Sequence, residues 1–131
     1  DVEIKCVTKE GNYIIRNQTE YNDLLNKKFE HPLCENVQLP IVDFNIYDLL
    51  GVVTSIEGIK PHIETNLVYD MNTNTYYHNS NVITYGNFAK NNILSHWCLI
   101  PKLRDSQTVQ FNKNNCRKQL EELKQSLKAD E

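Results

Sequence analysis

The four cysteines are the first residues to test for chemistry, because a cysteine can be a metal ligand, a nucleophile or half of a disulfide. They are Cys6, Cys34, Cys98 and Cys116, and no two of them form a Cys-x-x-Cys pair. This spacing gives no basis for a zinc ribbon or a thioredoxin-like site. His31 and Cys34 could supply two metal ligands, but no second close pair completes a set. We therefore predict no metal site and no cofactor.

The cysteines leave two interpretations open. Cys6 and Cys98 lie in apolar strand-like patterns and Cys116 on an apolar helical stripe, which is typical of buried core residues. The same residues could form disulfides in an oxidising compartment, with three connectivities if all of them pair. The prediction we take forward combines export with at least one disulfide.

Nucleophilic catalysis finds little support among the remaining reactive residues. Cys98 stands between Trp97 and Leu99, where a thiolate would be poorly solvated, and the adjacent His96 fits a sheet position better than a general base. The chain has only 4 glycines and contains no phosphate-binding loop, GxSxG or HExxH motif. We predict no catalytic residues and no enzyme activity; the alternative is a small hydrolase with an unrecognised site.

One polar segment matches part of a calcium-binding loop. Residues 70–74 alternate oxygen-bearing side chains as the first five positions of such a loop do. Thr75 stands where the sharp turn requires glycine, and Asn81 stands where a bidentate glutamate is needed. The segment is better explained as the polar tip of a hairpin.

Tyrosines are concentrated around this tip. Tyr69, Tyr76 and Tyr77 flank it, and tyrosines on an exposed sheet face are effective anchors for a protein partner. Cross-strand packing is the alternative explanation of the same residues. We predict Tyr69, Tyr76 and Tyr77 as the binding residues.

Strands must position these side chains. The densest apolar stretch, residues 42–57, predicts a central strand covered on both faces. Residues 63–69 alternate, and residues 76–85 are rich in Tyr, Val, Ile and Thr, so the two should be antiparallel neighbours. Residues 2–8 and 13–15 should form two strands of a hairpin. We expect further strands at residues 94–100 and 108–111.

Two helices complete the expected fold. Asn17 and Glu20 form a capping box before a helix over residues 18–29. The apolar stripe of Cys116, Leu120, Leu123 and Leu127 predicts a C-terminal amphipathic helix that docks on the sheet, with pairing to a partner's helix as the alternative. The predicted fold class is α+β, mainly antiparallel, in a single domain over residues 1–131.

The composition of the chain limits the classes of partner that we expect. The 131 residues carry a net charge of -3 with both signs interspersed, so a nucleic-acid partner is not expected. No stretch approaches the roughly 18 apolar residues of a spanning helix, so we expect no membrane insertion of the mature domain. The chain opens on Asp1 without an apolar leader, and we interpret it as a mature or trimmed chain whose targeting segment, if it had one, is gone.

Several short motifs, taken in order, resemble small exported proteins of the PrcB-like family. They are Glu20-Tyr21 with Leu24, the loop containing Cys34, residues 39–44, Leu49-Leu50-Gly51 and residues 97–102. The resemblance spans residues 14–111 and implies a bacterial (lipo)protein that serves as an accessory to a surface protease complex. It implies no catalytic residues.

We therefore expect a non-enzymatic binding or accessory module of the bacterial cell envelope. The mature domain would lie in the periplasm or at the cell surface and bind another protein of the envelope. Besides the hydrolase, the alternative is a structural subunit recruited through its C-terminal helix.

Overall fold

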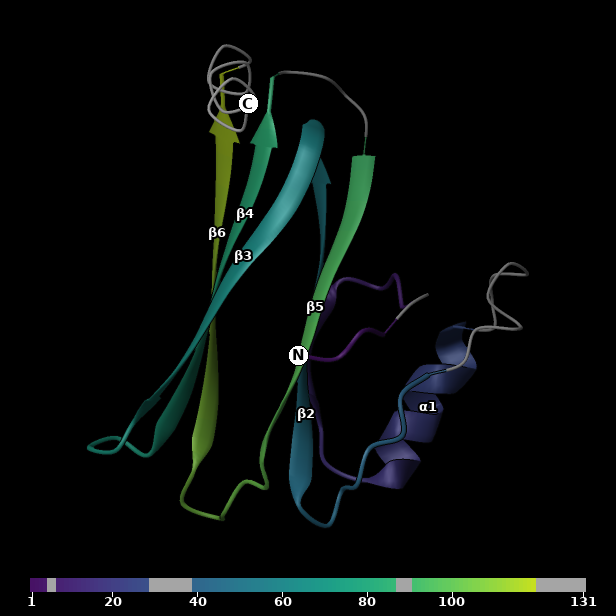
Figure 1. Ribbon diagram of the computed structural model, residues 1–131, viewed down its shortest axis with the longest axis vertical. Helices are drawn as coiled ribbons and strands as arrows, with labels where there is room; N and C mark the ends of the chain where they lie inside the picture. The colour runs from purple at the N-terminus through teal and green to yellow at the C-terminus, as the bar shows by residue number, and fades with distance from the viewer. Residues whose placement is uncertain (5–6, 29–38, 87–90, 120–131) are drawn as a thin grey trace, which may run out of the picture. The chain divides into compact units, whose positions relative to one another are not determined.

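A computed structural model describes residues 1–4, 7–28, 39–86 and 91–119 (Figure 1). Along the chain the elements are β1 (Gly11–Ile15), α1 (Gln18–Lys28), β2 (Tyr47–Glu57), β3 (Ile59–Asp70), β4 (Thr75–Tyr85), β5 (Asn91–Pro101) and β6 (Thr108–Lys118). They form two three-stranded sheets, β1-β2-β5 and β3-β4-β6.

The predicted α+β class is wrong, because the described residues are mainly β with one short helix. The predicted C-terminal helix is contradicted at its first residue: Cys116 lies in β6, paired with Ile83 of β4. Leu120, Leu123 and Leu127 lie outside the described residues. A stripe at helical spacing cannot reveal that a distant strand offers an unpaired edge, and here the pairing with β4 overrides the local pattern.

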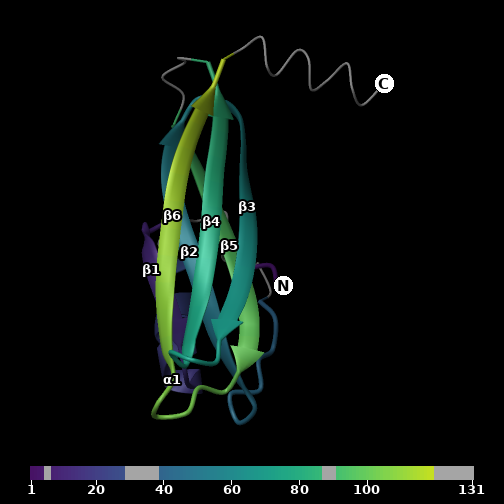
Figure 2. The ribbon, with the colours of Figure 1, turned by 90° about the vertical axis from the view of Figure 1, so that its left-hand side faces the viewer.

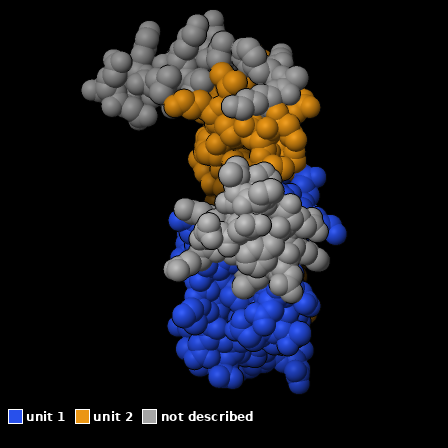
Figure 3. Space-filling view, turned by 90° about the vertical axis from the view of Figure 1, so that its right-hand side faces the viewer, with its two compact units in different colours: residues 1–54, 95–107 blue, residues 55–94, 108–131 orange. Residues whose placement is uncertain are grey.

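The chain divides into two compact units, coloured separately in Figure 3. Unit 1 comprises residues 1–54 and 95–107, and unit 2 comprises residues 55–94 and 108–131. Two of the three divisions fall inside strands, one in β2 and one in β5, and the third falls just before β6 begins at Thr108. The expectation of a single domain over residues 1–131 stays a prediction.

The central strand is confirmed, with a later start. β2 lies between β1 and β5, and its residues from Asp48 to Thr54 are all buried. It begins at Tyr47 because the carbonyl of Asp43 accepts the N–H groups of Ile46 and Tyr47, which turns the chain just before the strand. The hairpin predicted for residues 2–8 and 13–15 is wrong. β1 pairs instead with β2, and Val2 forms an isolated bridge to Trp97.

The predicted helix is confirmed as α1. Asn17 accepts the N–H of Glu20 on its side-chain oxygen at 2.8 Å, and the Glu20 carboxylate accepts the N–H of Arg16 at 2.9 Å. The first bond satisfies one of the N–H donors that a helix start leaves without partners, and the second ties the residue before the cap to the first turn. Tyr21 and Leu24 point from α1 into the core of unit 1, and the Tyr21 hydroxyl donates to the carbonyl of Pro40 at 2.7 Å.

The core of unit 1 is built around Trp97, which is 2% exposed, as its apolar context predicted. Its ring lies so close to β2 that a Cβ added to Gly51 would come within 2.1 Å of it. Tyr13 packs beside it with ring centroids 5.4 Å apart. Other members of this core are Ile4, Val7, Ile15, Tyr21, Leu24, Val42, Leu49 and Val53.

The sheet of unit 2 contains the predicted antiparallel pair, β3 and β4, with β6 running parallel to β4 on its other side (Figure 2). Since side chains alternate along a strand, residues of β4 divide between two faces of this sheet. His78, Ser80, Val82 and Thr84 share one face and are buried. Asn79 and Asn81 belong to the opposite face, where Asn81 is exposed.

Candidate functional site

The structure brings together two of the three predicted binding tyrosines. Tyr69 of β3 and Tyr76 of β4 are directly opposite in the register, and their ring centroids are 4.6 Å apart. Tyr77 follows Tyr76 along the strand, so it points to the other face, where it lies opposite Val68. The predicted site is therefore a pair of tyrosines in ring contact, with planes inclined by 38°, and one tyrosine on the reverse face.

Other large apolar residues surround the pair and are exposed. Leu67 is 42% exposed, Tyr69 37% and Met71 80%. Leu67 shares the face of the tyrosine pair, and Met71 lies in the turn that follows. We call Leu67, Tyr69, Met71 and Tyr76 the hairpin end. Sequence reasoning missed Leu67 and Met71, although an apolar residue in a polar turn was a usable signal.

Polar side chains shape the turn of the hairpin end, as the hairpin-tip interpretation predicted. The Asp70 carboxylate accepts the N–H of Asn72 at 2.8 Å, and the Tyr69 hydroxyl donates to the side-chain oxygen of Asn74 at 3.1 Å. Asn74 adopts a φ of 51°, which asparagine tolerates better than most residues. These contacts order the backbone of the turn and hold the ring of Tyr69 at the end of the ribbon.

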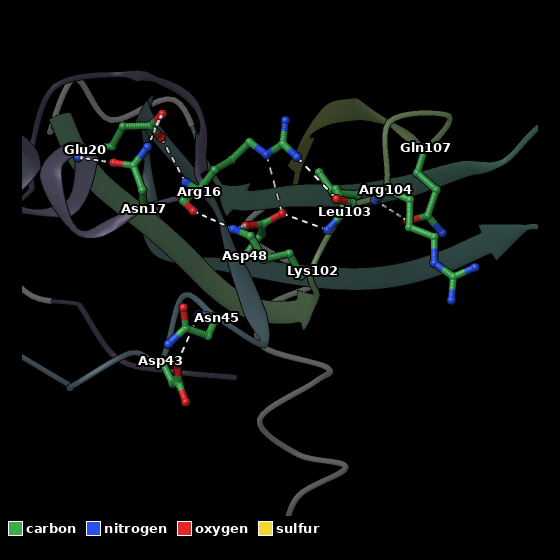
Figure 4. Close-up of polar contacts among 10 residues, drawn as sticks. All are labelled: Arg16, Asn17, Glu20, Asp43, Asn45, Asp48, Lys102, Leu103, Arg104 and Gln107. Carbon is green, nitrogen blue, oxygen red and sulfur yellow. Dashed lines mark hydrogen bonds and ion pairs between the residues drawn. The ribbon is translucent and has the colours of Figure 1, made fainter.

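A second group of polar residues centres on Asp48 in unit 1 (Figure 4). Asp48 is 0% exposed although it stands in the most apolar stretch of the chain. Its carboxylate accepts a hydrogen bond from Lys102 Nζ at 2.8 Å and from the N–H of Leu103 at 2.8 Å, and Arg16 Nε lies 3.6 Å away. Lys102 also donates to the carbonyl of Arg16 at 2.6 Å. A buried carboxylate is thus matched by donors from two distant segments.

A cavity of about 460 Å³ lies beside this group. It is lined by Arg16, Asn17, Gln18, Val42, Asp43, Phe44, Asn45 and Lys102. The charges of Arg16 and Lys102 are balanced by Asp48 and Asp43, so the site has no surplus of positive charge to attract an anion. We conclude that the Asp48 group positions the segments around it. Sequence reasoning missed the group because its members are far apart in the chain.

The residues considered for nucleophilic chemistry lie in β5. Cys98 is 5% exposed, and burial raises the pKa of its thiol, so the thiol stays protonated and unreactive. Burial, together with the N-terminal ammonium, lowers the pKa of His96, whose Nε2 lies 3.3 Å from the Asp1 carboxylate. Cys98 and Cys116 are free thiols. His31, Cys6 and Cys34 lie outside the described residues, so the predicted disulfide stays a prediction.

Comparison with protein-family models, curated proteins and solved structures finds no match to this chain. The resemblance to PrcB-like proteins therefore stays a prediction. Among the described residues, no helix combines the length and the apolar character that crossing a bilayer requires.

Proposed function

We propose that this chain is a non-enzymatic binding domain that contacts a partner protein through the hairpin end. The observation that supports the proposal is the exposure of Leu67, Tyr69 and Met71 within a stretch of five residues, beside Tyr76, whose ring contacts that of Tyr69. Large apolar side chains gathered at an exposed position are typical of protein-contact sites.

The construction of the hairpin end suits a contact surface. Contact between the tilted rings of Tyr69 and Tyr76 restricts both rings before any partner arrives, so binding loses less side-chain entropy. Met71 is unbranched and adapts its shape to an apolar pocket. The hydroxyls and amides at the rim, those of Tyr69 and Asn74 among them, are able to form hydrogen bonds around an apolar centre.

The cellular setting belongs to the same proposal. We place the domain in the bacterial envelope, exported to the periplasm or cell surface, with an envelope protein as its partner. The hydrolase alternative has less support, because the raised pKa of Cys98 disfavours the thiolate that attack requires. The alternative of recruitment through a C-terminal helix concerns residues 120–127, which lie outside the described residues.

The proposal is tested by photo-cross-linking in cells of the source organism. A photoreactive phenylalanine analogue at Met71 should give one discrete cross-linked protein, and Tyr69→Ser with Tyr76→Ser should abolish that product. Tyr77→Ser is the matched control, since it removes the neighbouring ring on the opposite face of the same hairpin. Circular dichroism establishes that each variant remains folded.

Three results would overturn the proposal. A cross-linked product that survives the Tyr69 and Tyr76 changes would show that the hairpin end does not hold the partner. A product lost only with Tyr77→Ser would move the contact to the reverse face. A hydrolytic activity that disappears in folded His96→Ala or Cys98→Ala protein would favour the enzyme alternative instead.

A further inference from the structure

The reverse face of the β3-β4-β6 sheet carries side-chain amides in register. Directly opposite residues form one row of Asn66, Asn79 and Asn112, and a second of Glu64, Asn81 and Asn114. A third row is formed by Val68, Tyr77 and Gln110. We call these nine residues the amide face. All of them belong to unit 2.

Hydrogen bonds orient part of this array. Gln110 donates from Nε2 to the side-chain oxygen of Asn112 at 3.0 Å, and Asn112 donates from Nδ2 to the side-chain oxygen of Asn79 at 2.9 Å. Each amide has two donor hydrogens and an oxygen with two lone pairs, so one bond of each kind leaves further capacity for a ligand. Asn112 and Gln110 are exposed, and so their remaining groups face solvent.

The composition of the amide face differs from that of an ordinary solvated sheet surface. Asparagine is depleted in strands, whereas Asn66, Asn81 and Asn114 all occupy exposed strand positions. Of the nine side chains only Glu64 is charged. The surface therefore lacks the basic groups that attract nucleic acid or anionic lipid, and its many donors and acceptors match an uncharged, polyhydroxylated ligand.

Aromatic rings border the amides on the same face. Tyr77 stands beside the row that contains Asn79. Beyond Asn81, Tyr85 is buried, at 7% exposure, and the half-buried ring of His62 stacks on it, with ring centroids 6.4 Å apart and planes inclined by 27°. An aromatic ring offers an apolar surface to the C–H side of a sugar ring, while a planar amide can bond two neighbouring hydroxyls at once.

We propose that the amide face binds a neutral oligosaccharide or polysaccharide. Neighbouring strands are about 4.8 Å apart, so amides that are in register across three strands can contact hydroxyl groups on successive sugar units. Charge favours this ligand: among the nine residues of the amide face the one charged group is the Glu64 carboxylate, which suits an uncharged glycan better than an acidic one. The proposal is independent of the hairpin end, whose tyrosine pair faces the other side of the sheet.

Affinity electrophoresis provides the test. The full chain is run in native gels that contain dextran, hydroxyethyl cellulose, xylan or mannan, and is applied to an array of neutral glycans. We expect retardation in at least one gel, and a loss of affinity of tenfold or more in Asn79→Ala with Asn112→Ala. Asn81→Ala with Asn114→Ala is a second double variant, in case the first fails to fold.

Asn115→Ala is the matched control. Asn115 is an exposed asparagine of β6, but its register partner is the buried Val82, so it belongs to the opposite face. The Asn115→Ala variant and the Tyr69→Ser variant should both be retarded as strongly as the unmodified chain. Sedimentation at the same concentrations shows whether retardation reflects a second copy of the chain instead of a glycan.

Three results would overturn the inference. One is no retardation and no array signal with any neutral glycan. Another is equal retardation of folded double variants and unmodified chain. The third is binding that is confined to an acidic glycan, such as hyaluronan. If the chain with the photoreactive analogue at Met71 and no other change gives no cross-linked protein while glycan binding is intact, the proposed function alone is refuted. Cross-linking as expected without glycan binding would refute this inference alone.

Discussion

Gly51 is required by the packing of a single ring. A Cβ at this position would lie 2.1 Å from two carbons of Trp97, far inside van der Waals contact. We expect Gly51→Ala to lower the free energy of unfolding by about 3 kcal/mol, because the tryptophan must leave its place in the core. Urea unfolding followed by circular dichroism measures the change.

A double-mutant cycle isolates this contact. In a Trp97→Ala background the ring is gone, and Gly51→Ala should then cost less than about 1 kcal/mol. A cost that is equal in both backgrounds would mean that strand backbone effects, and not the ring, explain the glycine.

His96 should make stability depend on pH. Its pKa is lowered in the folded chain, chiefly by burial, so the unfolded chain takes up the proton at higher pH than the folded chain does. The free energy of unfolding should therefore fall as pH drops below about 6.5, because the unfolded chain then binds more protons than the folded chain. Above that pH, His96 should contribute no pH dependence. Urea unfolding at about pH 7.5 and pH 5.5 should show a smaller difference in His96→Gln than in the unmodified chain. An equal difference would remove His96 as the cause.

At the scale of residues, sequence reasoning succeeded where the immediate neighbours decide burial. Trp97 and Cys98 lie in a long apolar run, and both are buried. It could not identify Gly51 or Asp48, because the reasons for these residues lie in segments about fifty positions away. The sequence also did not show which of Tyr76 and Tyr77 shares a face with Tyr69; the register of β3 and β4 shows that Tyr76 does.

Asp48 connects several elements, so its replacement should destabilise all of them. Its carboxylate joins β2 to Arg16, which precedes α1, and to Lys102 and Leu103, which follow β5. We expect Asp48→Asn to destabilise unit 1 by about 3 kcal/mol, because it removes the charge that two cations and a buried N–H face. Thermal unfolding monitored by Trp97 fluorescence measures the loss.

Asp43→Asn is the control for this change. Asp43 is exposed. Its side chain accepts a hydrogen bond from the N–H of Asn45 at 3.0 Å, which is the one bond that Figure 4 draws for it among the described residues. An asparagine keeps that acceptor, so stability should change by less than about 0.5 kcal/mol. Comparable losses in the two variants would show that burial of Asp48 is not the source of its effect.

Elements were predictable when local signals agreed with long-range pairing. For α1 the capping residues, the apolar spacing and the core contacts of Tyr21 all favour a helix. For residues 108–118 the local signals conflicted: a short strand pattern ran into an apolar stripe at helical spacing. Parallel pairing along the whole of β4 resolved the conflict in favour of a strand. Such pairing depends on residues more than thirty positions away and leaves no periodic trace in the segment itself.

At the scale of the whole molecule, two strands, β2 and β5, belong partly to each compact unit. The divisions at residues 54/55 and 94/95 fall within these strands, so unfolding of either unit disrupts one part of each of them. A division of this kind differs from a flexible linker, at which domains usually separate. We therefore expect one cooperative unfolding transition for the whole chain.

Val82→Ala tests this expectation with a probe placed in the other unit. Val82 is 0% exposed in unit 2, whereas Trp97, the only tryptophan, lies in unit 1. Removing two buried methyl groups should destabilise the chain by about 2 kcal/mol. If the chain unfolds as one, the Trp97 fluorescence transition and the circular dichroism transition should move to lower urea by the same amount. A Trp97 transition that stays in place while the dichroism separates into two steps would show that each unit unfolds by itself.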